Sequence, residues 1–109
     1  MYRSIYNLVE NAIKYNREYG SVRVDIQEDN QSVTVLIHDS GYGIPIEKWD
    51  KIFESFYRID KSRSRKMGGA GLGLALVKVI ALLHHGKVKV IDSNKNGTII
   101  ALSFRKLFV

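Results

Sequence analysis

The stretch from residue 72 to residue 85 constrains the fold most, because it is a helix-length run that is apolar around nearly its whole circumference. Its only charged residue before the closing histidines is Lys78. A helix that is apolar on all sides is stable only when other elements cover it. We therefore predict that this helix lies at the centre of the core and that Gly86 ends it.

The other segments supply the layers around that helix. Helical spacing or strand alternation of apolar residues assigns most of them. In chain order we predict a helix over 2–16, strands over 21–29 and 32–39, a short helix over 46–54, a loop over 57–70, the helix over 72–85, and strands over 87–92 and 97–104. This order predicts one α/β (α+β) domain over residues 1–109, with helices layered on one sheet.

Composition narrows the class of protein. The chain has 109 residues and no cysteine, which excludes disulfides and thiolate metal sites. No apolar run reaches membrane-spanning length, so we expect the chain itself to be cytoplasmic. The net charge of +6 and the pI near 9.7 indicate an anionic partner: nucleic acid, a membrane surface or nucleotide phosphates.

A glycine-rich segment, "GGAGLGLALVK" at 68–78, precedes the apolar helix and follows the basic residues Arg65 and Lys66. It lacks the Gly-Lys-Ser/Thr ending of a P-loop and the preceding strand of a dinucleotide fingerprint. What remains is a set of backbone amides at a helix N-terminus, which can hold phosphate, or simply a flexible hinge.

A second motif, "DSGYGIP" at 39–45, places Asp39 at the end of a strand and directly before a Gly-x-Gly turn. The carboxylate can accept a hydrogen bond from an exocyclic amine while the glycines let a flat ring approach. The alternative is that Asp39 only braces its own turn.

A third motif is a polar stripe on the first helix. At about 100° per residue, Asn7, Asn11 and Lys14 fall on one face, opposite the apolar one. Neutral amide oxygens suit Mg²⁺, which takes its other ligands from water and substrate phosphates. The alternative is an ordinary solvent-facing stripe.

Together, the segments "NLVENAIKYN", "DSGYGIP", "IFESFYRID", "GGAGLGLALVK" and "NGT" occur in the order of the N, G1, F and G2 boxes. The chain thereby resembles the catalytic ATP-binding (HATPase_c) domain of bacterial sensor histidine kinases, within the GHKL superfamily, from about residue 5 to 105. The resemblance implies a Bergerat-type two-layer sandwich, a mixed sheet with three helices on one face, and ATP with Mg²⁺ as cofactors. Family members have a strand and further helical turns upstream, so we expect an N-terminally truncated domain without its dimerisation domain.

The resemblance also implies residue roles. Asn7 and Lys14 would assist at the phosphates, and Asn11 would be the Mg²⁺ ligand. Asp39 would bind the adenine amine. The other residues expected to hold the nucleotide are Tyr15, Gly41, Gly43, Ile44, Phe53, Phe56, Tyr57, Arg58, Gly69, Gly71, Leu72, Gly73, Leu74 and Thr98.

One difference from the family pattern, at Asn7, indicates whether the γ-phosphoryl group of ATP goes to water or to another acceptor. Relatives that hydrolyse ATP have a glutamate where this chain has Asn7, and an amide cannot take a proton from water. We therefore expect transfer of the γ-phosphoryl group to a histidine on a separate dimerisation domain, with a response regulator as the further partner. His38, His84 and His85 are expected to be structural, so the isolated chain should not phosphorylate itself.

Two alternatives stay open: a GHKL-type serine kinase of the anti-sigma kind, and a basic module that binds nucleic acid or anionic lipid without nucleotide. The position of the basic residues beside the glycines favours nucleotide over nucleic acid. The resemblance further implies a membrane-anchored homodimer for the full-length protein. A chain that lacks an edge element is also expected to self-associate.

Overall fold

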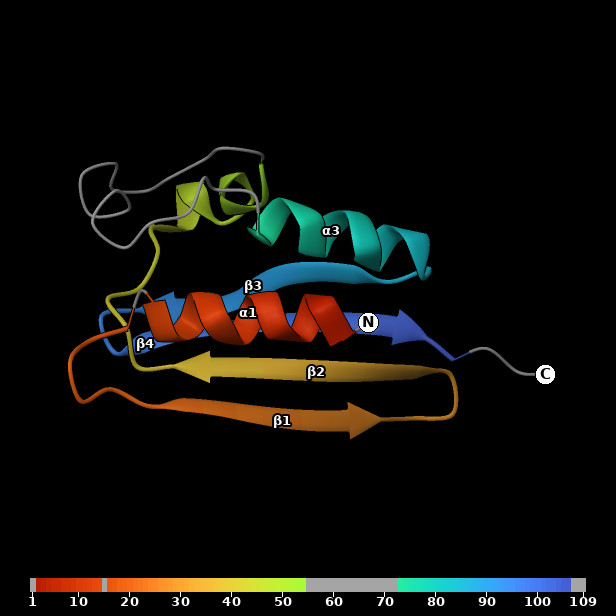
Figure 1. Cartoon of the computed structure of the whole chain (residues 1–109), viewed down its shortest axis with the longest axis horizontal. Helices are drawn as coiled ribbons and strands as arrows, with labels where there is room; N and C mark the ends of the chain where they lie inside the picture. The colour runs from red at the N-terminus through yellow and green to blue at the C-terminus, as the bar shows by residue number, and fades with distance from the viewer. Residues whose placement is uncertain (1, 15, 55–72, 107–109) are drawn as a thin grey trace.

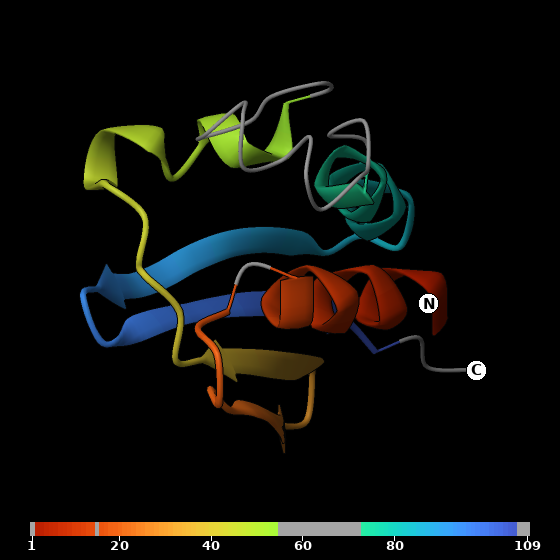
Figure 2. The ribbon, with the colours of Figure 1, turned by 60° about the vertical axis from the view of Figure 1, so that its left-hand side comes forward.

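The computed structural model describes residues 2–14, 16–54 and 73–106 of the chain. Its elements are α1 (Tyr2–Lys14), β1 (Val22–Glu28), β2 (Ser32–Asp39), the 3-10 turns η1 (Ile46–Lys48) and η2 (Lys51–Phe53), α3 (Gly73–Leu83), β3 (Lys87–Asn94) and β4 (Gly97–Arg105). Figures 1 and 2 show α1 and α3 together on one face of the sheet. The predicted two-layer arrangement of helices on one sheet is confirmed.

The sheet has the strand order β1-β2-β4-β3, and each neighbouring pair is antiparallel. The predicted mixed sheet is therefore wrong for the described strands. Two hairpins, β1–β2 and β3–β4, supply all four strands, and β2 and β4 pair antiparallel between them. Asp39 at the end of β2 lies opposite Thr98 near the start of β4.

The core lies between the sheet and the two helices. Alternate residues of the central strands face the helices, which is why Val35 and Ile37 on β2 and Leu102 on β4 are almost fully buried. Leu8 of α1 and Val77 of α3 close the core from the other layer. Burial of this shared apolar surface stabilises the two-layer fold.

Residues 46–54 form the two 3-10 turns rather than the single short helix predicted from the sequence. The indole Nε1 of Trp49 donates to the carbonyl oxygen of Ile44 at 2.9 Å, which holds the segment back against its own start. Ile52 and Phe53 at the second turn are buried in the core. Their burial anchors this segment to the core, and the 3-10 hydrogen bond from the Glu54 N–H to the Lys51 carbonyl closes the second turn.

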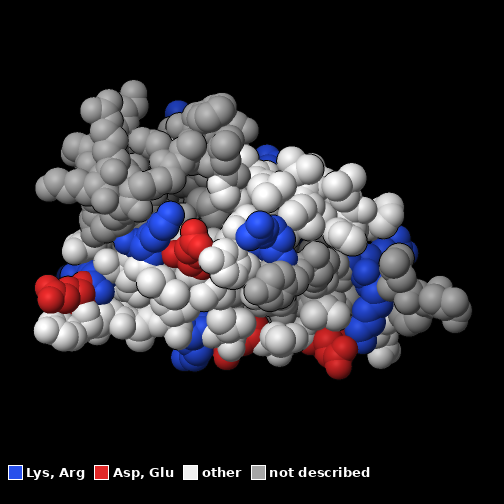
Figure 3. Space-filling model, in the orientation of Figure 1, with Lys and Arg blue, Asp and Glu red and all other residues white. Residues whose placement is uncertain are grey.

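α3 is not buried on all sides, contrary to the prediction. Val77 and Ala81 are buried, but Val79 is 52% exposed and Leu83 is 72% exposed. In the described part of the chain α3 packs on α1, η2 and the β3–β4 hairpin, which cover only its inward face. Figure 3 shows a largely uncharged surface above α3.

The end of α3 closes in a Schellman motif. The N–H of Gly86 donates to the carbonyl oxygen of Ala81 at 2.7 Å, and His85 takes the left-handed conformation with φ of 56°. Glycine is the usual residue at that left-handed position. Gly86 itself passes so close to the Ser103 carbonyl that a side chain would not fit there.

The β1–β2 hairpin is fixed by a carboxylate in its turn. Asp29 Oδ1 accepts from the backbone N–H groups of Gln31 and Ser32, each at 2.7 Å. These donors hold the pKa of Asp29 below its ordinary range. The predicted hairpin between residues 21–29 and 32–39 is confirmed.

Candidate functional site

The candidate site is centred on Asp39, which ends β2. Its Oδ1 atom accepts from the Gly41 N–H at 2.9 Å and from the Thr98 N–H at 3.3 Å. No hydrogen bond from the described residues reaches Oδ2. Burial raises the pKa of Asp39, and the two N–H donors oppose that rise. The carboxylate is thus fixed through one oxygen and available through the other.

The turn after Asp39 is built around glycines. Gly41 is buried, and Gly43 has a φ of 86°, which L-residues with side chains rarely adopt. A Cβ on Gly43 would also collide with the carbonyl oxygen of Asn94. The Ile44 N–H donates to Ser93 Oγ at 2.7 Å, so the turn is bonded directly to the end of β3.

Ser93 is a site residue that sequence reasoning missed. Its hydroxyl lies 2.7 Å from Thr98 Oγ1, and Thr98 is only 4% exposed. The two residues are cross-strand partners at the β3–β4 turn. The signal was the symmetrical placing of a serine and a threonine around "NKNG", which a hairpin brings opposite each other.

The predicted residues Phe53 and Leu74 help to position the adjoining segments. Phe53 is 6% exposed and belongs to the core, and Leu74 packs partly buried against that core at the start of α3. They therefore tie η2 and the first turn of α3 to the same core.

One residue of the polar stripe of α1 contacts the start of α3. Asn7 Nδ2 donates to the carbonyl oxygen of Gly73 at 3.5 Å, although the two residues lie 66 positions apart. Asn11, one helical turn further on, is partly buried. Lys14 forms an ion pair with Glu10 at 3.5 Å. The stripe thus combines two amides and an ammonium group on the helix that contacts Gly73 at the start of α3.

A cation at this stripe would have few protein ligands. The described ranges contain no group of three or more His, Cys, Asp or Glu side chains that could hold a metal ion. The amide oxygen of Asn11 is a hard, neutral donor of the kind that Mg²⁺ accepts alongside water and phosphate oxygens. The donor set therefore fits a Mg²⁺ ion that arrives with a phosphorylated ligand.

Several predicted site residues lie outside the described residues. These are Tyr15, Phe56, Tyr57, Arg58, Gly69, Gly71 and Leu72.

The histidines lie apart from this stripe. His38 Nε2 lies 3.0 Å from Asp25 Oδ2 on the outer face of the sheet. His84 and His85 are exposed at the C-terminal end of α3. Neither location brings an imidazole to the amides of α1.

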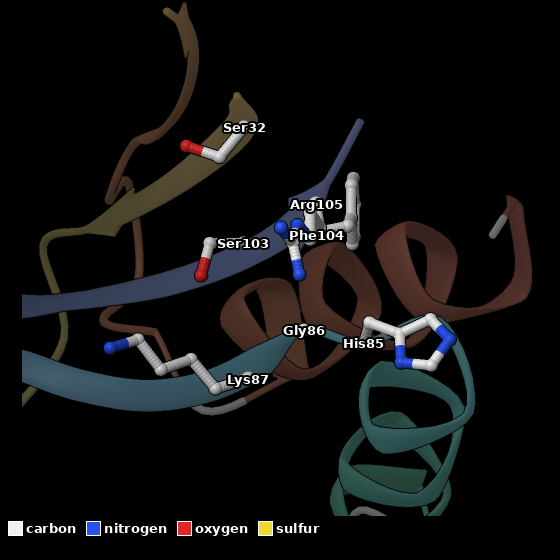
Figure 4. Close-up of a pocket in the computed structure, with 7 residues that line it drawn as sticks. All are labelled: Ser32, His85, Gly86, Lys87, Ser103, Phe104 and Arg105. Carbon is white, nitrogen blue, oxygen red and sulfur yellow. The ribbon is translucent and has the colours of Figure 1, made fainter. Parts of the chain in front are cut away.

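A separate hollow of about 280 Å³ lies at the opposite end of the sheet, where Ser32 pairs with Arg105. Figure 4 shows the side chains of Lys87 and His85 extending to opposite sides of Gly86. None of the predicted nucleotide-site residues lines it. The hollow is therefore distinct from the site around Asp39.

None of the helices within residues 2–14, 16–54 and 73–106 has the length and apolarity needed to cross a membrane.

The chain is similar to known proteins over most of its length. Residues 1–107 match the family described as histidine kinase-, DNA gyrase B-, and HSP90-like ATPase. Sensor protein kinase WalK of Staphylococcus haemolyticus (strain JCSC1435) is 43% identical over 99 residues, which are 89% of this chain. The chain spans 16% of the length of that relative.

Solved structures give the same result at the level of the fold. A mycobacterial sensor histidine kinase, MprB, superposes with a TM-score of 0.80 at 33% identity, over 94% of this chain and 68% of that one. Full-length ShkA in complex with AMPPNP has a TM-score of 0.81 at 26% identity, over 98% of this chain and 22% of that one. ThkA in complex with the response regulator protein TrrA has a TM-score of 0.74 at 28% identity, over 95% of this chain and 28% of that one.

The Asp39 turn and the amide stripe thus stand on a fold shared with sensor histidine kinases, and the sequence match covers nearly every residue. This chain belongs to the histidine kinase-, DNA gyrase B- and HSP90-like ATPase family.

Proposed function

We propose that this chain binds Mg-ATP between the Asp39 turn and the amide stripe of α1, and donates the γ-phosphoryl group to a histidine on a separate dimerisation domain. The proposal rests on the hydrogen bonding of the Asp39 carboxylate. Two backbone N–H groups hold Oδ1, and no described residue donates to Oδ2. A half-buried acceptor with one occupied oxygen suits the exocyclic amine of a purine.

The glycine turn supports the same ligand. The Gly43 backbone lies against the end of β3, and Ile44 continues from it into the core. A flat ring can approach a backbone that carries no side chain, and the apolar neighbour can cover one face of the ring. This end of the site therefore fits the base rather than the phosphates.

The phosphate end of the ligand would lie along Asn7, Asn11 and Lys14. Asn11 would hold the Mg²⁺ ion, and Lys14 would exchange its exposed partner Glu10 for a phosphate oxygen. Bound Mg-ATP supplies the phosphoryl group and the neutralising charge, as is usual in phosphoryl transfer. Asn7, which already contacts the backbone of Gly73, would keep the start of α3 beside the phosphates.

Transfer to an acceptor suits this site better than hydrolysis does. Asn7 can orient a water molecule but cannot remove its proton. In transfer, the bond from the γ-phosphorus to the oxygen of ADP breaks and a bond to an imidazole nitrogen of the acceptor forms. The chain's own task is then to position the donor and exclude water.

The proposed partners follow from the relatives. The matched WalK protein is a sensor protein kinase, and ThkA was solved with the response regulator TrrA. For this chain we propose its own dimerisation and phosphoacceptor domain as the direct partner, and a response regulator as the indirect one. The longer protein would be a membrane-anchored homodimer with this domain in the cytoplasm.

Titration with Mg-ATP tests the proposal. We expect saturable binding by the wild-type chain and strong weakening in Asp39→Ala and Asn11→Ala. Arg23→Ala is the matched control, because Arg23 pairs with Asp25 on the outer face of the sheet. Unaltered affinity in both site variants would contradict the proposal.

A second assay tests the transfer. γ-labelled Mg-ATP is mixed with this chain and a separately produced histidine-bearing dimerisation domain. We expect acid-labile label on the acceptor only when both proteins are present. Acid-stable serine label would indicate the serine-kinase alternative, and nucleic-acid binding without any nucleotide affinity would indicate the basic module.

A further inference from the structure

Arg17, in the connection between α1 and β1, joins three parts of the candidate site. Its Nε donates to the carbonyl oxygen of Gly41 at 3.3 Å, and its Nη2 donates to the carbonyl oxygen of Lys95. Its guanidinium also lies over the ring of Tyr42, 4.8 Å from the centroid. One side chain thus bonds the turn after β2 to the turn between β3 and β4.

These two turns are the ones that hold Asp39. Gly41 donates its N–H to Asp39 Oδ1 and offers its carbonyl to Arg17. Thr98, the second donor to Oδ1, follows Lys95 by three residues, at the start of β4. Both donors to Oδ1 therefore lie on segments whose relative position Arg17 fixes.

The backbone of Arg17 is itself anchored. Its N–H donates to Asn16 Oδ1 at 2.8 Å, and the same oxygen accepts from Ser40 Oγ at 2.9 Å. Asn16 Nδ2 donates to the Ser21 carbonyl at 2.8 Å. The backbone from which the guanidinium extends is thus already held by hydrogen bonds. Less conformational entropy is therefore lost when the Arg17 side chain binds its two carbonyl acceptors.

We propose that Arg17 is a positioning residue for Asp39, and that it sharpens recognition of the adenine amine without touching the nucleotide. This inference rests on the proposed function. Arginine is required because its planar group donates in two directions and stacks on an aromatic ring at the same time. Lysine keeps the charge but has neither the fork nor the plane.

The first test needs no nucleotide. We expect the amide protons of Gly41 and Thr98 to move toward their non-hydrogen-bonded shifts in Arg17→Ala and Arg17→Lys. The control Arg23→Ala should leave both amides where they are in the wild type. Unmoved Gly41 and Thr98 amides in both Arg17 variants would overturn the inference. If Arg17→Ala fails to fold, Arg17→Lys carries the test, because it keeps the charge and the aliphatic stem.

The second test uses Mg-ATP and Mg-ITP, which differ at the purine amine. We expect Arg17→Lys to bind Mg-ATP about tenfold more weakly, which is the effect of losing roughly one charge-assisted hydrogen bond. The affinity for Mg-ITP should change much less. Equal losses for both nucleotides would indicate a merely structural role. Failure of the wild type to bind Mg-ATP would remove the proposed function, while the amide shifts would still decide whether Arg17 positions Asp39.

Discussion

Gly97 passes so close to the carbonyl oxygen of Asp39 that a Cβ on Gly97 would lie far inside van der Waals contact. Gly97 also has a φ of 138°, a conformation that other residues rarely adopt. The β3–β4 turn and the end of β2 are therefore in direct backbone contact. This contact keeps the Thr98 N–H within reach of the Asp39 carboxylate.

Replacing Gly97 with alanine should destabilise the fold and displace Asp39. We expect a loss of about 2–3 kcal/mol in the free energy of unfolding, from backbone strain and the collision together. Urea unfolding measures this. Gly73→Ala is the matched control, because a Cβ there meets nothing within 4 Å, and its stability should stay within about 0.5 kcal/mol of wild type. Equal losses in the two variants would contradict the close approach.

His85 should be less favourable than glycine at the end of α3. Because it holds a φ of 56°, His85→Gly should raise the free energy of unfolding by about 1 kcal/mol. His84→Gly, one residue earlier, should instead lower it by about 0.5–1 kcal/mol through lost helix propensity. Thermal unfolding of the pair checks this, and a stabilising His84→Gly with a destabilising His85→Gly would refute the Schellman assignment.

The exposed side of α3 should contribute little to stability. Leu8 is 1% exposed and Leu83 is 72% exposed. Leu8→Ala should therefore cost about 3 kcal/mol, and Leu83→Ala less than about 0.5 kcal/mol. Chemical denaturation of both variants makes the comparison. A cost for Leu83→Ala close to that for Leu8→Ala would mean that the outer face of α3 is covered in solution.

Periodic segments were predictable from the sequence, because alternation and helical spacing report which residues are buried. The strands at 21–29 and 32–39 were placed close to the observed Val22–Glu28 and Ser32–Asp39. Periodicity does not report how many neighbours exist to cover an apolar helix. For that reason the outward face of α3 was wrongly expected to be buried.

From the residues alone, the site was predictable only where its chemistry is local in the chain, as in the motif formed by Asp39 and the glycines after it. Thr98, whose N–H reaches Asp39 Oδ1 from 59 positions away, was expected only through the family resemblance. Arg17 has no such motif, because its bond to Lys95 spans 78 positions. Contacts of this kind follow from the register of the sheet, which a single sequence does not specify.

The affinity for Mg-ATP should fall on acidification through the titration of Asp39. Burial raises the pKa of this carboxyl above its ordinary value of 3.8, so protonation begins at a higher pH than for an exposed aspartate. The protonated acid is a poorer acceptor for the adenine amine. The contribution of Asp39 to the free energy of unfolding changes in the opposite direction. Because its pKa is higher in the folded state, this contribution is fully present below pH 3.8 and is lost as the pH rises through the raised pKa.

Isothermal titration of wild type and Asp39→Asn across the acidic range measures this effect. The difference between the two curves cancels the titration of the nucleotide itself. We expect the wild type to lose affinity more steeply than Asp39→Asn. Asp25→Asn, on the outer face of the sheet, should follow the wild type, and parallel curves for wild type and Asp39→Asn would argue against a role for the Asp39 charge.

Recognition of the purine amine by Asp39 is tested most directly by the ratio of the affinities for Mg-ATP and Mg-ITP. ITP carries a carbonyl where ATP carries the amine, so at that position only ATP offers the carboxylate a hydrogen-bond donor. We expect the wild type to prefer Mg-ATP by about 10- to 100-fold. Asp39→Asn, whose amide can also donate, should bring the ratio close to one. The same ratio in wild type and Asp39→Asn would contradict the claim.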